Sequence, residues 1–577
     1  MCLSVSAGLW LCAVSLSTLA GLLGCPGILK LQCTSVAITG GGLGQLGGLV
    51  SKDENKDAPA GAGLLRSSGI VGVMTMLSRV LGLIRDVVFA RFIGAEAGAD
   101  AFFVAFKIPN FLRRLFAEGA FAQAFVPVLS EYRTQGSVAA VRGLIDRVAG
   151  CLGVTLIFIT AIAVLGAPVL TMVFAPGFVD DPVRFPLAAG MIRITFPYLL
   201  LISMTGLAGA ILNSYDRFVI PAATPVLLNV VLISSALLAA PYFDPPVMAL
   251  AWGVLAAGVV QLLFQLPFLW RLGLMPTPKV DWRDDGVKRV LALMAPAIFG
   301  VSVSQINLLL DTVLASFLPT GSVSWLYYSD RLAELPLGVF AIAIATVILP
   351  GLSRQHASDD PERFSTTLDW AVTMVMIVAL PAALALIILA EPILMTLFQY
   401  GKTTASDVAM SSLSLRAYAL GLLAFMLIKV LAPGFYARQD MKTPVKIGVI
   451  AMVSNMVLNL LFVAPLYFIW NIGHVGLALA TSASAFINAG LLWRGLRRAG
   501  IYRAKAGWGR KLLAMLVANT AMAAALVVGL GAIDGWQEWL WWQRAGHLAV
   551  LCLAGALVYG VALLAGGIRW RDFKAGF

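Results

Sequence analysis

The chain has 577 residues, of which 60% are hydrophobic and only 12% are charged, whereas a soluble domain has about 25% charged residues. This composition excludes a soluble enzyme, a fibrous protein and a disordered protein, and it predicts a polytopic membrane protein. The net charge of +12 is typical of a membrane protein whose cytoplasmic loops collect Lys and Arg, and we expect no nucleic-acid partner because no soluble segment interleaves basic and aromatic residues.

The first 63 residues differ from the rest of the chain. Residues 1–29 are apolar but contain no Lys or Arg, so they lack the basic start of a secretory signal. A glycine-rich run at 40–48 and a polar stretch at 51–57 have the composition of a linker. We expect residues 1–63 to be an extension that is disordered or that precedes a native start near Leu64.

Fourteen apolar segments follow, and each is long enough to cross a membrane, which takes about 20 residues of helix. They span residues 68–93, 101–129, 145–174, 187–212, 219–241, 246–270, 289–318, 322–351, 367–398, 408–435, 443–469, 472–496, 511–533 and 546–567. Lipid offers the backbone no hydrogen bonds, and the alternating pattern of a transmembrane barrel is absent, so we expect these segments to be α-helices. The predicted fold class is an all-α polytopic membrane protein.

The loops between these segments differ in charge according to the side of the membrane that they face. Basic residues gather in alternate loops, for example around Arg147, Arg283 and Arg498, whereas the opposite loops carry acidic residues such as Asp181 and Asp244. Because Lys and Arg stay on the cytoplasmic side, both termini are predicted to be cytoplasmic, in agreement with an even number of spans.

Landmark residues recur at a nearly constant offset, which indicates an internal repeat. Four pairs are 223 to 225 positions apart (350 − 127 = 223, 311 − 86 = 225): Asp86 and Asp311, Pro127 and Pro350, Gly177 and Gly401, and Pro221 and Pro444. Each repeat holds an even number of spans, so both halves enter the membrane from the same side. Transporters built this way bind substrate between the halves and rock one against the other. We therefore predict a six-helix half at 64–275, a second at 276–500, and two extra helices with a tail at 501–577.

Ionisable residues lie within the first two spans, although one charge at the bilayer centre costs at least about 2.5–3.5 kcal/mol. These spans carry Arg79, Arg85, Asp86, Arg91, Asp100, Lys107, Asn110, Arg113, Arg114 and Glu118. The eighth span carries Ser324, Tyr328, Asp330, Arg331 and Glu334. Helical spacing puts Lys107, Arg114 and Glu118 on one continuous face. We expect such faces to line a watery cavity.

The signs of these charges do not balance. In the first two spans six cations, at 79, 85, 91, 107, 113 and 114, face three carboxylates, at 86, 100 and 118. One interpretation is structural: ion pairs such as Arg85 with Asp86 or Arg114 with Glu118 hold helices together, and Arg91 extends to the membrane surface. The other is that the surplus binds an anion. Because guanidinium groups match phosphate oxygens, we favour a substrate that carries phosphate or pyrophosphate.

Four segments resemble the MurJ (MviN) family: SRVLGLIRD at 78–86, DAFFVAFKIPNFLRRLFAEGAF at 100–121, GSVSWLYYSDR at 321–331 and KVLAPGFYARQD at 429–440. The likeness runs from residue 64 to the C-terminus. It implies a lipid II flippase of the multidrug/oligosaccharidyl-lipid/polysaccharide exporter superfamily in the bacterial inner membrane, a transporter rather than an enzyme. The implied substrate is undecaprenyl-pyrophosphate-linked disaccharide-pentapeptide, moved outward by alternating access for peptidoglycan synthesis.

The resemblance also assigns roles to residues. The family's essential cavity arginines match Arg79, Arg85, Arg113 and Arg331, and further cavity positions match Asp86, Asp100, Ser324 and Glu334. Together with Lys107 and Glu118 from the polar face of the second span, these are the predicted substrate-binding residues. The family's two extra C-terminal helices, which form a groove for the lipid tail, match 511–567.

Some relatives carry a sodium site in the second half, and the nearest polar residues here are Asp311, Asn455, Asn459 and Thr481. Their oxygen atoms suit a hard cation, although the asparagines would equally serve as hydrogen-bonding links between helices. We expect no other cofactor, with Na⁺ as the candidate coupling ion. The expected partners are lipid II, membrane lipids and the cell-wall synthesis machinery.

Three other functions are alternatives. A flippase for another polyprenyl-pyrophosphate-linked oligosaccharide, of the O-antigen type, fits the cations but not the four quoted segments. A drug exporter of the same superfamily would need a cavity rich in carboxylates and aromatic rings. A polytopic enzyme acting on polyprenyl phosphates would need clustered Asp with His or Mg²⁺ ligands at one membrane face, and the sequence contains no such cluster.

Overall fold

The structure is a computed structural model that describes residues 60–568 apart from 115–120, 505–506 and 532. Most of the predicted N-terminal extension and the predicted site residue Glu118 lie outside the described residues. Every secondary-structure element in the described part of the chain is a helix. The predicted all-α class is therefore confirmed.

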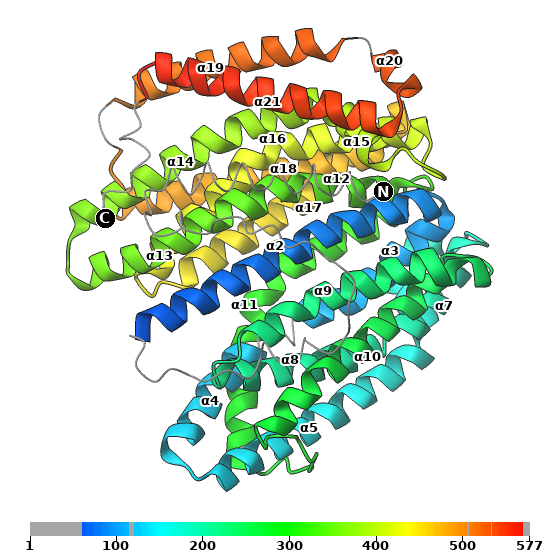
Figure 1. Ribbon diagram of the computed structural model, residues 1–577, viewed down its shortest axis with the longest axis vertical. Coiled ribbons are helices and arrows are strands. Elements are labelled where there is room, and N and C mark those ends of the chain that lie inside the picture. Colours follow the sequence, from blue (N-terminus) through cyan, green and yellow to red (C-terminus); the bar gives the residue numbers. More distant parts are fainter. Residues whose placement is uncertain (1–59, 115–120, 505–506, 532, 569–577) are drawn as a thin grey trace, which may run out of the picture.

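The helices that precede residue 272 form one bundle, and α2 runs along the region where this bundle meets the next (Figure 1). They are α2 (Ala60–Ile93), α3 (Ala97–Arg113), α4 (Phe121–Gln135), α5 (Val138–Leu165), α6 (Ala167–Phe174), η2 (Pro176–Phe178), α7 (Arg184–Thr195), α8 (Tyr198–Ser214), α9 (Val219–Ser234), η3 (Ser235–Ala239), η4 (Ala240–Tyr242) and α10 (Met248–Arg271).

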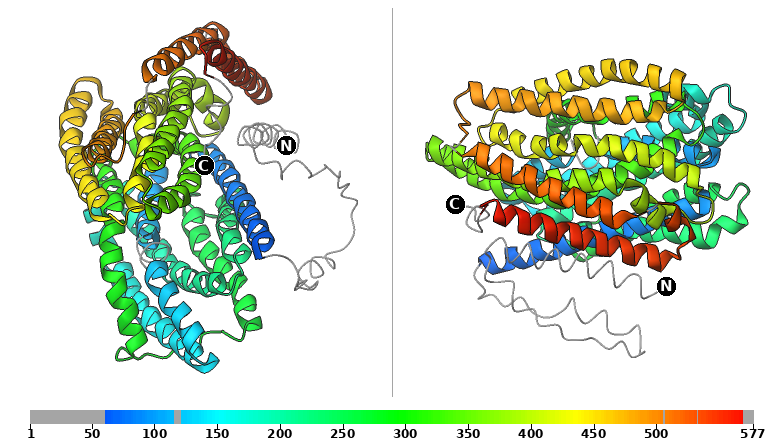
Figure 2. Two further views of the ribbon diagram at one scale, coloured as in Figure 1. Left: turned by 90° about the vertical axis from the view of Figure 1, so that its left-hand side faces the viewer. Right: turned by 90° about the horizontal axis from the view of Figure 1, so that it is seen from above.

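The following helices form a second bundle, and the last three lie along its outer side, away from the first bundle (Figure 2). The second bundle contains α11 (Asp285–Ser316), α12 (Ser322–Pro336), η5 (Leu337–Ala341), α13 (Ile342–Ala357), α14 (Pro361–Ile388), α15 (Ala390–Phe398), α16 (Ala405–Tyr436), α17 (Lys442–Trp470) and α18 (Gly473–Arg498). The last three are α19 (Trp508–Leu530), α20 (Ile533–Glu538) and α21 (Trp541–Ala565).

Among the described residues, 11 helices are long and apolar enough to cross a membrane. The multi-span membrane architecture is thereby confirmed. The three other predicted spans coincide with α2, with α3 and α4 together, and with α11. The total of fourteen spans and the cytoplasmic position of both termini stay predictions.

The helix boundaries repeat with the offset that the sequence landmarks indicated. Val138–Leu165 and Pro361–Ile388 are each 28 residues long and begin 223 residues apart (361 − 138). Both are followed at once by a short apolar helix, α6 or α15. Asp216 and Gln439, also 223 residues apart (439 − 216), both adopt the uncommon left-handed backbone conformation, with φ of 61° and 60°. The repeat in the sequence is therefore a repeat of structure, whereas the exact limits of the halves stay predictions.

Helix α11 packs with both bundles. Its first turns insert Val287, Val290 and Met294 into an apolar core formed by helices of the first bundle. Asp284 fixes this end, because its carboxylate accepts a hydrogen bond from the Val287 N–H at 3.1 Å and pairs with Arg147 of α5 at 2.8 Å. Farther along, α11 packs against α17 and α18. The helix that connects the halves thus spans their interface.

The C-terminal helices are fastened to the second bundle by a buried carboxylate. Asp369 on α14, only 2% exposed, accepts hydrogen bonds from the Tyr502 hydroxyl at 2.9 Å and from the Trp508 indole N–H at 2.8 Å. Both donors belong to the segment that leads from α18 into α19. Asp369 therefore determines where α19 begins relative to α14.

We predict that Asp369→Ala lowers the melting temperature of the purified protein. The substitution leaves two donors without their acceptor, and each buried unpaired group costs about 1–3 kcal/mol. Asp285→Ala is the matched control, because the Asp285 side chain is 99% exposed and pairs only across one helical turn with Lys288. Equal melting temperatures for the two variants would contradict the anchoring role of Asp369.

Candidate functional site

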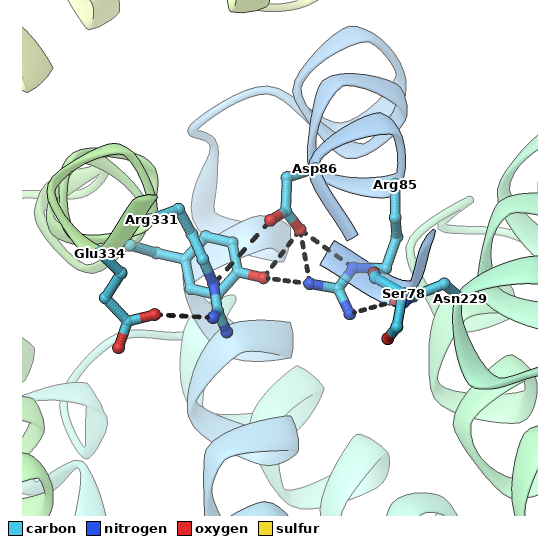
Figure 3. A network of polar contacts seen from close by, with 7 residues as sticks. Ser78, Arg85, Asp86, Asn229, Arg331 and Glu334 are labelled. Carbon is cyan, nitrogen blue, oxygen red and sulfur yellow. Dashed lines mark hydrogen bonds and ion pairs between the residues drawn. The ribbon is translucent and has the colours of Figure 1, made fainter. Parts of the chain in front are cut away.

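A buried cluster of charges lies where α2 meets α12 (Figure 3). Arg85 and Asp86 on α2 are only 7% and 2% exposed. Arg85 donates from Nε and Nη2 to Asp86 Oδ1 at 3.0 and 2.7 Å. The other Asp86 oxygen, Oδ2, lies 3.8 Å from Nε of Arg331 on α12. One carboxylate thus stands between guanidinium groups that belong to the two bundles.

Tyr327 and Asn229 complete this cluster, and the sequence analysis missed both. The Tyr327 hydroxyl donates to Asp86 Oδ1 at 2.9 Å and accepts from Arg85 Nη2 at 3.0 Å. Its ring stacks on Phe103 at 4.0 Å between centroids. The Asn229 oxygen accepts from Arg85 Nη1 at 3.0 Å. The available signal was a lone asparagine in an otherwise apolar span.

Arg331 also reaches a carboxylate of its own helix. Its Nη1 lies 3.2 Å from Glu334 Oε2, and its guanidinium lies over the Tyr327 ring, 5.0 Å from the centroid. Within this cluster, Arg85 and Arg331 therefore face Asp86 and Glu334. The expected ion pair between Arg85 and Asp86 is present in the protein interior, but both residues belong to α2, so this pair by itself does not hold two helices together.

A cavity of about 130 Å³ adjoins the cluster and is lined by both bundles. Its described charged lining residues are Lys107, Arg114, Arg331, Asp311, Asp330 and Glu334. Lys107 and Arg114 come from α3, as the predicted polar face of the second span requires. The carboxylates come from α11 and α12, so the second bundle supplies acids to the cations of the first. The surplus counted over the first two spans therefore does not extend to this lining, which holds three cations and three acids.

Arg79 lies outside that lining but also reaches the second bundle. Its guanidinium rests directly on Gly338, in the π-helical turn η5, where an added Cβ would overlap the Arg79 Nη1 atom. Gly338 is thus the residue that admits Arg79, and sequence analysis did not single it out. Nothing in the sequence around this glycine distinguishes it from the other glycines of the membrane spans.

Two predicted site residues bind each other at an end of α12. Asp100 is fully buried, and its Oδ1 accepts from the Ser324 N–H at 2.9 Å and the Ser324 hydroxyl at 2.6 Å. Its Oδ2 accepts from the Gly321 N–H at 2.7 Å. Asp100 thereby caps the first turn of α12, which leaves several N–H groups without helical partners. A role for Asp100 and Ser324 in substrate binding stays a prediction.

Arg113 faces a different cavity. It donates from Nε and Nη2 to Asn110 Oδ1 at 3.0 and 2.8 Å. Asn110 lines the cavity between the bundles, whereas Arg113 lines a cavity of about 320 Å³ within the first bundle. The structure therefore brings Arg85, Asp86, Arg331 and Glu334 together and holds Arg113 one helical turn beyond Asn110.

The four residues of the predicted cation site lie together. Asp311 accepts hydrogen bonds from Asn459 Nδ2 at 3.0 Å and Thr481 Oγ1 at 3.3 Å. Asn459 Nδ2 also donates to Asn455 Oδ1 at 2.8 Å. The Asn459 oxygen is buried and has no hydrogen-bond partner among the described residues. This oxygen-rich set, with one carboxylate, fits a monovalent hard cation, although the hydrogen bonds between helices expected under the alternative are also present.

An apolar groove of about 480 Å³ runs between the second bundle and the C-terminal helices. Its lining includes Phe340, Trp370, Met522, Leu526 and Tyr559. The Tyr559 hydroxyl donates to the Ile377 carbonyl at 2.8 Å. That carbonyl is available because Pro381, four residues later, has no N–H to donate. The predicted groove beside the two extra helices is therefore present, and a side chain of α21 closes one of its walls.

We predict that Gly338→Ala destabilises the protein only while Arg79 is present. The new methyl group would overlap the guanidinium, and overpacking typically costs about 1–3 kcal/mol. Melting temperatures of Gly338→Ala, Arg79→Ala and the double variant form a cycle that isolates this contact. Gly490→Ala is the control, since a Cβ at Gly490 meets open space. Equal losses from Gly338→Ala with and without Arg79 would show that the contact does not exist.

Comparisons with known proteins show the family to which this chain belongs. A family model described as lipid II flippase MurJ matches residues 89–542. A probable lipid II flippase MurJ of Vibrio cholerae is 52% identical over 526 residues, covering 89% of this chain and 98% of that protein. The lipid II flippase MurJ of Burkholderia cenocepacia is 43% identical over 519 residues, covering 89% and 98%.

Solved structures extend the likeness to three dimensions. A lipid II flippase MurJ in an inward closed conformation matches with a TM-score of 0.72 and 27% identity, covering 87% of this chain and 99% of that one. An inward-facing multidrug resistance MATE transporter of the MOP superfamily shares the fold, with a TM-score of 0.61 and 15% identity over 75% of this chain and 98% of that one. The chain therefore belongs to the MurJ family of lipid II flippases and is a multi-pass protein of the bacterial inner membrane.

Proposed function

We propose that this protein moves lipid II from the cytoplasmic to the periplasmic leaflet by alternating access between its two bundles. The observation that carries the proposal is the buried contact of Arg85 and Asp86 on α2 with Arg331 on α12. It gathers guanidinium groups of both bundles at one point, and a pyrophosphate binds several guanidinium groups at once. Relatives named lipid II flippase support this choice of substrate.

The arginines exchange partners when the substrate enters. Arg85 and Arg331 are held by Asp86 and Glu334, and the pyrophosphate competes with these carboxylates because it carries the same sign of charge. Arg79, against Gly338, and Arg113, beside Asn110, complete the anion site. A ligand shifts a conformational equilibrium only when its affinity differs between the states. The exchange supplies such a difference, because it replaces an ion-pair contact that bridges the bundles.

The two parts of the substrate occupy different surroundings. The charged headgroup lies in the polar cavity between the bundles, and the polyprenyl tail lies in the apolar groove beside α14 and α21. The charged headgroup then stays in polar surroundings throughout transport, and the polyprenyl tail stays in apolar surroundings. The tail position explains why the groove wall carries almost only apolar side chains.

The energy for resetting the transporter comes from a cation or from the membrane potential. Asp311, Asn455, Asn459 and Thr481 would hold Na⁺, whose charge neutralises Asp311 and so alters the field at Lys107 across the cavity. The potential contributes about 2.3 kcal/mol per charge per 100 mV. The cation and the membrane potential would both act on charged side chains that line the cavity.

We predict that Arg79→Ala and Arg331→Ala insert normally into the membrane but flip lipid II at least about 10-fold more slowly. A charge-assisted hydrogen bond contributes about 1.5–3 kcal/mol, and about 1.4 kcal/mol corresponds to a factor of ten. The assay is exposure of lipid II on the outer face of proteoliposomes. Arg363→Ala is the control, because Arg363 is 79% exposed and pairs locally with Asp360. Full activity of both cavity variants would refute the proposal.

We predict that Na⁺ raises the melting temperature more than K⁺ does, and that Asp311→Asn abolishes the difference. A ligand present at about 100 times its Kd stabilises the folded state by about 2.7 kcal/mol. Asp330→Asn serves as the control, since Asp330 lines the same cavity but is not one of the four residues of the predicted cation site. An equal response of the unaltered protein to both ions would exclude Na⁺ at this cluster.

A further inference from the structure

The cavity within the first bundle has no part in the transport cycle as described so far. It encloses about 320 Å³ between α4, α8, α9 and α10, and Arg113 is among its lining residues. Its almost fully buried polar side chains include Thr224, Gln261 and Gln265, at 5%, 2% and 1% exposure. Buried amides in an apolar bundle are costly unless they have hydrogen-bond partners. Their arrangement therefore indicates what the cavity accommodates.

Hydrogen bonds fix the orientation of both glutamine amides. The Thr224 hydroxyl donates its proton to the Ile220 carbonyl, so the hydroxyl oxygen Oγ1 of Thr224 is available as a hydrogen-bond acceptor. Gln265 Nε2 donates to that oxygen at 2.9 Å, and Gln261 Nε2 donates to the Thr224 carbonyl at 3.0 Å. Both amide nitrogens thus donate hydrogen bonds to Thr224 of α9. The amide oxygens necessarily point the other way.

The Gln265 oxygen then has no partner. Gln261 Oε1 accepts from the Tyr198 hydroxyl at 3.4 Å, whereas Gln265 Oε1 is buried without a hydrogen-bond partner in the described part of the chain. It lies on the cavity wall beside Gly209, where an added Cβ would be 3.8 Å from it. A buried acceptor without a donor costs about 1–3 kcal/mol. A hydrogen-bond donor placed in the cavity would satisfy this oxygen.

We propose that this cavity is a subsite for the sugar part of the headgroup, an inference that rests on the proposed function. Sugar hydroxyl and acetamido N–H groups are donors, as the Gln265 oxygen requires, whereas an ionised phosphate or carboxylate only accepts. Tyr198 adds an aromatic side chain to the lining, and Gly206, Gly209 and Ala210 leave room for a bulky ring.

The position of the subsite matches the order of groups in the substrate. Arg113 lines this cavity and is bonded to Asn110, which lines the cavity between the bundles. In lipid II the first sugar is attached directly to the pyrophosphate. A sugar beyond Arg113 and a pyrophosphate at the interface thus lie on opposite sides of the same arginine. The exposed Asn213, near the end of α8, also lines the cavity.

Two variants test the subsite with the full-length protein in nanodiscs. Gln265→Met removes the unpartnered oxygen, and Gly209→Ala covers it with a methyl group that fits, since its nearest neighbour would be 3.4 Å away. The probes are lipid II and undecaprenyl pyrophosphate, which lacks the sugars. Gly190→Ala is the control, because a Cβ there meets open space.

We expect both variants to weaken binding of lipid II by about 3- to 10-fold, the effect of one neutral hydrogen bond. Binding of undecaprenyl pyrophosphate stays unchanged in both variants, and Gly190→Ala affects neither ligand. The melting temperature of Gly209→Ala also stays unchanged, whereas that of Gln265→Met falls, because this variant also loses the hydrogen bond from Nε2 to Thr224. Unchanged lipid II affinity in both variants would overturn the subsite, and so would an equal loss for both ligands.

Failure of the proposed function gives a different pattern. In that case the unaltered protein binds neither ligand, or Arg331→Ala leaves both affinities unchanged, and the subsite falls with it. If Arg331→Ala weakens both ligands while Gln265→Met and Gly209→Ala weaken neither, the pyrophosphate site stands and the sugar subsite is wrong.

Discussion

Asp86 is the buried carboxylate that lies between arginines of the two bundles. It is buried, it is bonded to Arg85 of its own helix, and it lies within ion-pair distance of Arg331 on the other bundle. Removing one partner from a buried ion pair is strongly destabilising because the remaining charge has no compensation. The bundles can therefore separate at this point only if another anion replaces the carboxylate, which links opening of the interface to the charge of the ligand.

The acids of the second bundle determine how selective this replacement is. Asp311, Asp330 and Glu334 line the same cavity as Lys107 and Arg114, so the cavity has no large net charge to attract any anion indiscriminately. A monovalent anion would gain one guanidinium and leave a carboxylate unpaired. A pyrophosphate would span several guanidinium groups at once, and under the proposed function this gives a balanced cavity a preference for pyrophosphate.

Sequence reasoning recovered what depends on periodicity and missed what depends on contact between distant segments. The spans, the 223-residue repeat and the gathering of Asp311, Asn455, Asn459 and Thr481 follow from hydropathy, offset and resemblance. Tyr327 was missed because its partners Arg85 and Asp86 are more than 240 positions away. Gly338 was missed because its role is to leave room for the Arg79 guanidinium, and the sequence does not show which residue packs against a glycine. Asp100 counted as a cavity charge, whereas its oxygens cap α12, a local geometry that no spacing rule reveals.

The two halves share a repeated helix arrangement, but their buried aspartates have different bonding partners. Asp86 and Asp311 are matched positions in the sequence, yet Asp86 is bonded to a guanidinium and Asp311 to an asparagine and a threonine. Under the proposed function, corresponding regions of the two halves would serve anion exchange in one half and cation binding in the other. Helix α11 carries Asp311 and also inserts its first turns into the first bundle. A cation at Asp311, as proposed, would therefore act on a helix that packs with both bundles.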